Sequence, residues 1–438
     1  MLTQARVAQL SSAFVFGVGH EARPIPDFLT AEAIAFGAYF VAVEIVRRTA
    51  TRRWHLAWVF AVALLCRFFL VPSSLIQEVD PYRYVWDGQA VIQGANPYVL
   101  SPKEALDSGA PPAIDMEGAA ARVYERVSYE EVPTLYPPLA QAWFALAQLL
   151  TPWELGGWRV LVLVADVATM VLLAFGLLGL GRPLAWVVVY AWSPLILKET
   201  SNGLHLDVVA VLGLAAMILA VLRGRAIAAF VALAWTALVK VFAVALVPVL
   251  AALAWSRRPR SAVLGMAVFA VLVAVAYLPW ADARGELFEG LFAFAERWQR
   301  NASIFAAAQL VVGDLARPLC GLLILAAVGG ATVAVVRHPD PMRANGAALA
   351  VIVAIFLFAP TSNPWYFTWA VPFLVFFPSR ALLLLSGLLF LYYAEFHFLY
   401  RDQPERLAAL HLLEYVPFYL ALGVEIWDAR RRRVALGG

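Results

Sequence analysis

The sequence predicts an all-α, polytopic membrane protein that forms a single domain over residues 1–438. Hydrophobic residues make up 63% of the chain and charged residues 14%, whereas soluble domains are roughly 45–50% apolar and about 25% charged. The apolar runs are continuous, while a transmembrane β-barrel would alternate apolar and polar residues over segments of about ten. Because helices satisfy their own backbone hydrogen bonds in lipid, a helical bundle follows.

A spanning helix needs about twenty mostly apolar residues. We expect a GT-C-like bundle of about 12–13 transmembrane helices, within the apolar runs 28–46, 54–72, 138–151, 157–179, 184–198, 206–222, 226–254, 261–280, 315–336, 345–359, 365–378, 381–399 and 409–427. The run 138–151 is short for a span, and we expect it to insert only partly. The run 226–254 is long enough for two short helices that meet near Lys240.

Basic residues predict which ends of these helices face the cytoplasm, because cytoplasmic loops carry an excess of arginine and lysine. Such residues gather at 47–53, 223–225, 257–260, 337–343, 380 and 430–433. The two long loops between them, 73–135 and 281–313, therefore face outward. Within the first, residues 103–126 are compatible with short helices on the membrane surface. We expect the cell's inner (plasma) membrane as the location.

Charged and aromatic residues gather at the start of the first outward loop. Asp80, Arg83, Tyr84 and Asp87 recur at helical spacing and share one face, with Asp80 as the N-cap ahead of a proline. A carboxylate near low-dielectric lipid has a raised pKa, which suits a general base. The alternative is a capped helix with a solvated face and an internal Asp–Arg pair.

A second polar cluster interrupts two apolar helices at residues 193–209. Ionisable residues at membrane depth are costly and mark functional sites. Together, the charged and polar residues of this cluster are suited to bind a phosphate and to orient a substrate. The alternative is that the lysine extends from a helix end and the aspartate caps the next helix. The residues are Lys198, Glu199, Asn202, His205 and Asp207.

Lys240 lies inside an unbroken apolar run, where a lone ammonium needs an anionic partner. A phosphate headgroup is one candidate, and an acidic side chain on another helix is the other.

Two outward segments add cations and aromatic rings. In 294–305, Arg297 and Arg300 suit a phosphate, and Trp298 and Asn301 suit a sugar ring. In 359–373, Trp365 and Tyr366 suit a substrate contact or an ordinary interfacial aromatic belt.

The order of these motifs resembles the GT-C superfamily of membrane glycosyltransferases. The segments EVDPYRYVWDGQAVIQGANPY (78–98) and TLYPPLAQAWFAL (134–146) are similar to the first outward loop of bacterial polyprenol-phosphate-mannose-dependent mannosyltransferases. They are also similar to that loop in the catalytic subunit of the first glycosylphosphatidylinositol mannosyltransferase. Glu78 stands where many relatives carry aspartate, and the helix expected at 28–46 is additional.

The resemblance implies an inverting transferase that moves a sugar, which we expect to be mannose, from a polyprenyl-phosphate donor to a glycan or glycolipid acceptor outside the membrane. The partners are then donor, acceptor and membrane lipids, without nucleic acid. No cofactor is expected. A divalent cation on Glu78 and Asp80 is compatible with the chemistry but not required.

The resemblance also implies roles for individual residues. Asp80, with Glu78, would be catalytic, and the donor phosphate would meet Lys240, Lys198, His205 and Arg297. The residues expected to contact substrates are Arg83, Tyr84, Asp87, Asn202, Asp207, Trp298, Asn301, Trp365 and Tyr366.

Three other functions fit parts of the sequence. A transporter or flippase of lipid-linked sugars would show paired halves and polar sites near the midplane, and we find no such symmetry. A related enzyme for arabinose, aminoarabinose or glucose is the second alternative, and the motifs do not exclude it. A non-catalytic scaffold would leave the Lys240 and Asp80 segments without a purpose.

Overall fold

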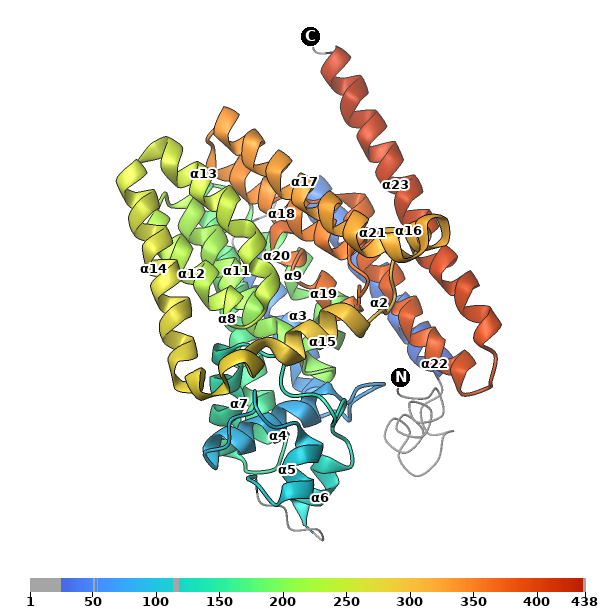
Figure 1. Ribbon diagram of the computed structural model, residues 1–438. Coiled ribbons are helices and arrows are strands. Elements are labelled where there is room, and N and C mark those ends of the chain that lie inside the picture. The colour runs from blue at the N-terminus through green and yellow to red at the C-terminus, as the bar shows by residue number, and fades with distance from the viewer. Residues whose placement is uncertain (1–24, 50–51, 53, 113–117, 436–438) are drawn as a thin grey trace.

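The computed structural model describes residues 25–49, 52, 54–112 and 118–435, with the side chains of 432–435 left out. Parts of the basic segments expected at 47–53 and 430–433 therefore lie outside what it describes. Helices make up most of this structure, and the only strand-like pairing within the described ranges is an isolated bridge between Arg300 and Thr361. The all-α class predicted from the sequence is confirmed (Figure 1).

The α-helices fall into three sets along the chain. The first is α2 (Ile25–Arg48), α3 (Trp54–Leu70), α4 (Asp80–Ile92), α5 (Pro102–Ser108), α6 (Ala119–Tyr124) and α7 (Pro138–Leu150). The second is α8 (Gly156–Gly179), α9 (Val188–Ala191), α10 (Pro194–Ile196), α11 (Asp207–Leu222), α12 (Ala226–Ala237), α13 (Val247–Arg257), α14 (Pro259–Tyr277) and α15 (Glu289–Arg297). The third is α16 (Ile304–Val312), α17 (Ala316–Arg337), α18 (Pro341–Phe358), α19 (Pro364–Phe367), α20 (Val371–Leu374), α21 (Arg380–Leu388), α22 (Ala394–Leu399) and α23 (Leu407–Ala435).

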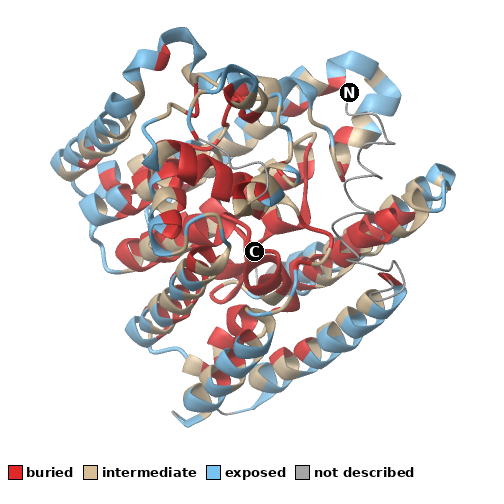
Figure 2. Cartoon of the chain, turned by 90° about the horizontal axis from the view of Figure 1, so that it is seen from below, coloured by how far each residue is buried: buried red, intermediate tan, exposed pale blue. Residues whose placement is uncertain are grey.

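Several of these helices are suited to a membrane. Among the described residues, seven helical stretches are long and apolar enough to cross, and five shorter helices are also apolar. The outer helices expose large apolar side chains, for example Val271 on α14 and Leu322 on α17, while the buried residues gather in the middle of the bundle (Figure 2). The chain is therefore a polytopic membrane protein. The count of 12–13 crossings stays a prediction.

The basic segments gather at one end of the bundle. There the guanidinium of Arg182, between α8 and α9, donates to the carbonyl of Phe376 at 2.7 Å, and Arg380 pairs with Glu44 of α2 at 3.6 Å. The long loop with α4, α5 and α6 lies at the other end (Figure 1). The distribution of cations predicted from the sequence thus matches the two ends of the structure.

Helix α7 begins and finishes at the end of the bundle that carries α4. At its start, Leu139 donates its backbone N–H to the carbonyl of Leu238 at 3.1 Å, where α12 terminates. At its finish, the Ala147 carbonyl lies against Gly157, at the start of α8, where a Cβ would come within 2.2 Å of that oxygen. Helix α7 therefore does not run from one end of the bundle to the other, and the partial insertion of 138–151 stays a prediction.

Three expected spans are broken. Residues 184–202 form a 3₁₀ turn (Leu184–Val187), α9, α10 and a π-helix (Leu197–Asn202). Residues 364–374 form the short helices α19 and α20. Between α12 and α13 the chain is extended at Lys240 (φ −143°, ψ 119°), as predicted from its position in the apolar run. Breaks and π-helices often occur at functional sites.

A buried ion pair anchors the broken segment 184–202. Arg67 of α3 lies 2.5 Å from Asp166 of α8, and its guanidinium also donates to the carbonyl of Ala191 at 2.9 Å. The hydroxyl of Tyr190 donates to the same carboxylate at 2.8 Å. Because Arg67 and Asp166 are no more than 1% exposed, each charge depends on the other for compensation.

We expect Arg67→Met to destabilise the protein by about 3–5 kcal/mol, because it leaves the Asp166 carboxylate buried without its cation. The double substitution Arg67→Met/Asp166→Leu should recover most of that loss. Thermal melts of the purified variants in one detergent measure both effects. A double variant as unstable as the single one would contradict the ion-pair account.

Candidate functional site

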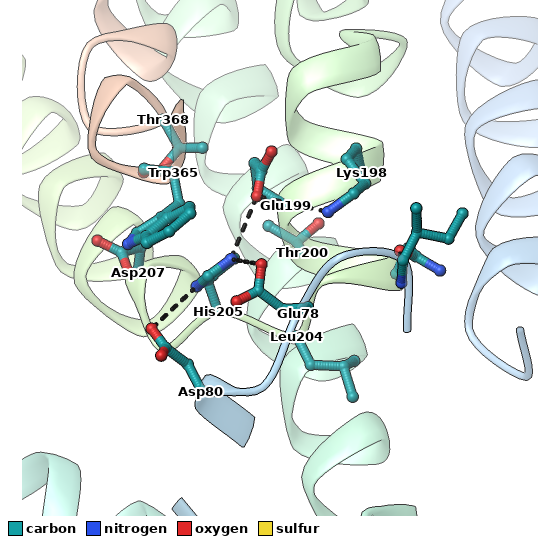
Figure 3. Close-up of polar contacts among 12 residues, drawn as sticks. Glu78, Asp80, Lys198, Glu199, Thr200, Leu204, His205, Asp207, Trp365 and Thr368 are labelled. Atoms are coloured by element: carbon teal, nitrogen blue, oxygen red, sulfur yellow. Dashed lines mark hydrogen bonds and ion pairs between the residues drawn. The ribbon is translucent and has the colours of Figure 1, made fainter. Parts of the chain in front are cut away.

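Charged residues from two distant segments meet at the α4 end of the bundle (Figure 3). The Nε2 atom of His205 lies 2.9 Å from a Glu78 oxygen and 3.3 Å from a Glu199 oxygen. Glu78 precedes α4, Glu199 lies in the π-helix, and His205 precedes α11. All three side chains are at most 4% exposed, so the imidazole joins two buried carboxylates.

Three residues in or next to the site have a strained backbone. Gln77, Tyr129 and Leu204 have φ values of 54°, 55° and 56°, a left-handed conformation that is unfavourable for residues other than glycine. Gln77 and Leu204 immediately precede Glu78 and His205 in the chain. Such strain is maintained only where surrounding contacts enforce it, and it is concentrated at functional sites.

Asn202 holds the two segments together. Its side-chain amide donates to the Ser73 hydroxyl and to the Ser74 carbonyl, each at 2.8 Å, and its carbonyl oxygen accepts from the Ile76 backbone at 3.1 Å. These bonds satisfy polar groups in the linker between α3 and α4. Asn202 was expected to contact a substrate, but its observed contacts position the chain ahead of Glu78.

Asp80 is the accessible carboxylate of the site. Its Oδ2 lies 4.0 Å from the Nδ1 of His205, and its side chain is 23% exposed. The Ser128 hydroxyl donates to its other oxygen at 3.4 Å. The N-cap of α4 is Val79, so the expectation that Asp80 caps the helix is wrong. As the first helical residue, Asp80 directs its carboxylate toward His205 (Figure 3).

The surroundings of Asp80 shift its acidity toward neutral pH. Burial raises the pKa of the Asp80 carboxyl from 3.8 to about 6, and the negative charge of Glu78 adds to the rise. The positive charges of His205 and Lys240 act in the opposite direction. A carboxylate of this pKa is ionised at pH 7 and accepts a proton more readily than an ordinary aspartate.

His205 is a cation at neutral pH. Burial alone lowers the pKa of its imidazole, but the charges and hydrogen bonds of Glu78 and Glu199 outweigh that effect and raise the pKa from 6.5 to about 10. The ring also stacks on Trp365, with centroids 4.0 Å apart and planes 14° apart. Trp365 therefore lies in the site, as expected, where it covers the imidazolium.

Lys240 pairs with Asp207 at 3.2 Å. The Trp369 indole N–H donates to the other Asp207 oxygen at 2.6 Å, and the Lys240 ammonium lies 5.1 Å from the ring centroid of Tyr366. This pairing is the acidic alternative foreseen for the lysine. Its side chain remains 13% exposed, so it is also open to an anionic ligand.

Lys198 is fully enclosed. Its ammonium donates to the Tyr393 hydroxyl at 3.1 Å and lies 3.9 Å from Glu199, and the Tyr393 hydroxyl donates to Glu199 at 2.7 Å. With a side chain only 2% exposed, Lys198 compensates Glu199. The contacts give no support to the expected phosphate role of Lys198.

Arg83, Tyr84 and Asp87 face the protein interior. Arg83 pairs with Asp87 at 2.7 Å, and the Thr134 hydroxyl donates to that carboxylate at 2.6 Å. Tyr84 stacks on Phe144 with centroids 4.6 Å apart. Their expected substrate contacts find no support, because these bonds fix α4 against α7 and the loop that precedes it.

The residues at the end of α15 and in the linker that follows it lie in different environments. The exposed Arg297 lines a surface groove of about 170 Å³ with Glu131 and Glu296, so its contacts do not support a phosphate role beside Asp80. Trp298 contacts Tyr129, with centroids 4.6 Å apart. Asn301 is buried, and its amide donates to Glu414 at 2.7 Å.

The site contains residues that the sequence did not single out as site residues. Tyr393 lies in an apolar run, and Tyr129 lies in the long loop. Burial raises the pKa of the Tyr129 hydroxyl, and the negative charge of Asp80 adds to that rise. Arg300 was named beside Arg297, and it is the partly exposed cation near Tyr129 and Tyr392. Glu199 was named in the polar interruption that contains His205, but it was given no individual role.

A metal-capable group exists, but it differs from the expected pair. Oxygen or nitrogen atoms of Glu78, Glu199 and His205 all lie within 4.8 Å of one another, a donor set compatible with a divalent cation. The His205 Nδ1 is buried without a hydrogen-bond partner among the described residues. A cation there would take ligands from these three residues.

Comparison with known proteins adds no assignment, because no family model and no curated protein matches the chain.

We expect the stabilisation contributed by His205 to depend on pH. Its pKa is higher in the folded chain, so the stabilisation is complete below about pH 6.5 and is lost as the pH rises toward about 10. The melting-temperature difference between wild type and His205→Gln should therefore shrink over this window. The exposed His338→Gln serves as the control, and a difference that grows with pH would contradict the prediction.

Proposed function

We propose that the protein transfers a sugar, mannose by the resemblance noted above, from a polyprenyl-phosphate donor to a hydroxyl of a glycan or glycolipid acceptor. The strongest support is the environment of Asp80, a partly exposed carboxylate with a pKa of about 6. It lies near the His205 imidazolium and the Lys240 ammonium, at the end of the bundle that carries the long loop. A base beside cations suits attack by a hydroxyl on a phosphate-activated sugar.

In this mechanism Asp80 removes the proton of the acceptor hydroxyl. The resulting oxygen attacks the anomeric carbon, and the bond from that carbon to the phosphate oxygen breaks. The polyprenyl phosphate leaves with the electron pair, which inverts the configuration at the sugar. Lys240, held by Asp207 at 3.2 Å, lies where it offsets the new phosphate charge.

The buried Glu78–His205–Glu199 group supports the base. His205 holds its Nδ1 4.0 Å from Asp80, and the positive charge of the imidazolium keeps the Asp80 pKa from rising further. Glu78 acts in the opposite direction. We infer that Glu78 acts through His205 and Asp80, since its side chain is only 4% exposed.

Asp80→Asn should lower sugar transfer by at least 100-fold, because a general base contributes about 10²–10⁴ to a rate. The assay incubates purified protein with labelled polyprenyl-phosphate mannose and an acceptor panel, and mass spectrometry identifies the product. The control is Asp107→Asn in the same loop, an exposed aspartate paired with Lys103. Near-normal turnover by Asp80→Asn would refute the assignment.

The transfer rate should fall about tenfold per pH unit below about pH 6, where Asp80 becomes protonated.

Movement of labelled lipid across sealed vesicles without a covalent product would favour a flippase instead.

The proposal also requires Asp80 outside the cytoplasm. In a background with Cys66 and Cys320 replaced by alanine, Ser108→Cys on α5 should react with a membrane-impermeant maleimide in intact cells. His338→Cys, exposed at the basic end, should react only after permeabilisation. The reverse labelling would put Asp80 in the cytosol and contradict the proposal.

A further inference from the structure

Tyr129 presents an aromatic ring at the edge of the Asp80 site. The residue is 40% exposed, and the residue before it, Ser128, donates its hydroxyl to Asp80 at 3.4 Å. The charges of Asp80 and Arg300 both act on the Tyr129 hydroxyl. The ring is therefore close to the accessible carboxylate of the site and to a partly exposed guanidinium.

The backbone of Tyr129 is held in a conformation that tyrosine rarely adopts. Its φ of 55° lies in the left-handed region, which is unfavourable for a residue with a Cβ. The buried Arg83 guanidinium holds this turn, because it donates to the carbonyls of Tyr129 and Val132 at 3.2 and 3.0 Å. Arg83 is itself fixed by Asp87 at 2.7 Å. An exposed ring adds little to the core, so the strain indicates a function for the ring.

A second ring reaches the same place from a different segment. Trp298 follows α15 and contacts Tyr129, with centroids 4.6 Å apart and planes 59° apart. Helix α15 is packed tightly on the long loop, since a Cβ on Gly290 would come within 2.5 Å of the Pro133 carbonyl oxygen. Trp298 is also only partly buried. Two partly exposed rings, each held by its own segment, thus form one aromatic surface.

The groups around this surface indicate what it binds. An aromatic ring of the membrane interface packs on lipid, but here a carboxylate and a guanidinium lie beside the ring. A sugar fits both features, because the C–H groups on one face of a sugar ring pack on an aromatic side chain. The hydroxyls at the edge of the sugar need polar partners, and Asp80, Ser128 and Arg300 offer them.

We propose that Tyr129 and Trp298 form an aromatic platform for a sugar ring next to Asp80. This inference rests on the proposed sugar transfer and names a substrate contact for it. Arg83 is then a positioning residue, which acts through the Tyr129 backbone. The sugar belongs to the donor or to the acceptor, since both bring a sugar ring to the same carboxylate, and kinetics distinguish the two.

The kinetic test compares Tyr129→Ala with Tyr129→Phe, which keeps the ring. The KM is measured for polyprenyl-phosphate mannose and then for the acceptor. We expect Tyr129→Ala to raise one of these KM values about tenfold with little change in kcat, and Tyr129→Phe to stay near wild type. The KM that rises identifies the sugar. A lower kcat with both KM values unchanged would overturn the platform.

Phe288→Ala is the matched control. Phe288 lies on the same outward segment and is also 40% exposed, but its ring contacts Tyr277, with centroids 5.5 Å apart. This variant should keep both wild-type KM values. The same rise in Phe288→Ala as in Tyr129→Ala would show a general effect of losing an exposed ring and would overturn the proposal.

A binding measurement separates this inference from the transfer reaction. Full-length protein in a sugar-free amphipol is mixed with the methyl glycosides of mannose, glucose and arabinose, and saturation-transfer difference NMR is recorded. We expect saturation of at least one glycoside by wild type and Tyr129→Phe, and its loss in Tyr129→Ala. Such a result without transfer from any donor would overturn the proposed function alone. No saturation by wild type, or equal saturation by Tyr129→Ala, would overturn the platform.

Discussion

The pairing of His205 with two buried carboxylates is the interaction on which the site depends. Glu78 and Glu199 lie 2.9 and 3.3 Å from one imidazole nitrogen, and they come from segments more than a hundred residues apart. Without the imidazolium, two carboxylates would be buried close together with only Lys198 to offset them. Their mutual repulsion would separate the α3–α4 linker from the π-helix. The position of Asp80, which begins α4, is therefore set by this charge pairing.

Broken helices supply most of the remaining site residues. The break at 197–206 carries Glu199 and His205, the extended residue between α12 and α13 is Lys240, and the break before α19 leads into Trp365. A continuous helix buries its backbone groups and presents side chains only around its own axis. Irregular backbone at membrane depth is tolerated where the protein encloses it. Here the enclosing network includes the Arg67–Asp166 pair and Asn202, which satisfy the groups that the breaks release.

The sequence predicted the fold class and the location of the polar interruptions, because composition and continuous apolar runs depend on local residues alone. The break at Lys240 was foreseen for the same reason. Side-chain pairing was not foreseen in detail. Arg83 and Asp87 have the spacing both of an internal pair and of a solvent-facing site, and the bonds that Thr134 and Gln141 donate to Asp87 decide for the internal pair. Tyr393 sits in an apolar run, where its hydroxyl gives no signal until Lys198 and Glu199 are placed beside it.

The cations of the site divide into two kinds. Lys198 and His205 are almost fully buried and have carboxylate or phenol partners within 3.9 Å. Their positive charges therefore compensate the buried carboxylates of the protein itself. Lys240 is 13% exposed and Arg300 38% exposed, and both lie near the aromatic rings around Asp80. A phosphate that approaches Asp80 is repelled by its carboxylate, so it needs cations that are exposed enough to reach it, even though each of these two also has a carboxylate partner. By this criterion Lys240 and Arg300, rather than Lys198 and His205, are the residues suited to bind an anionic substrate.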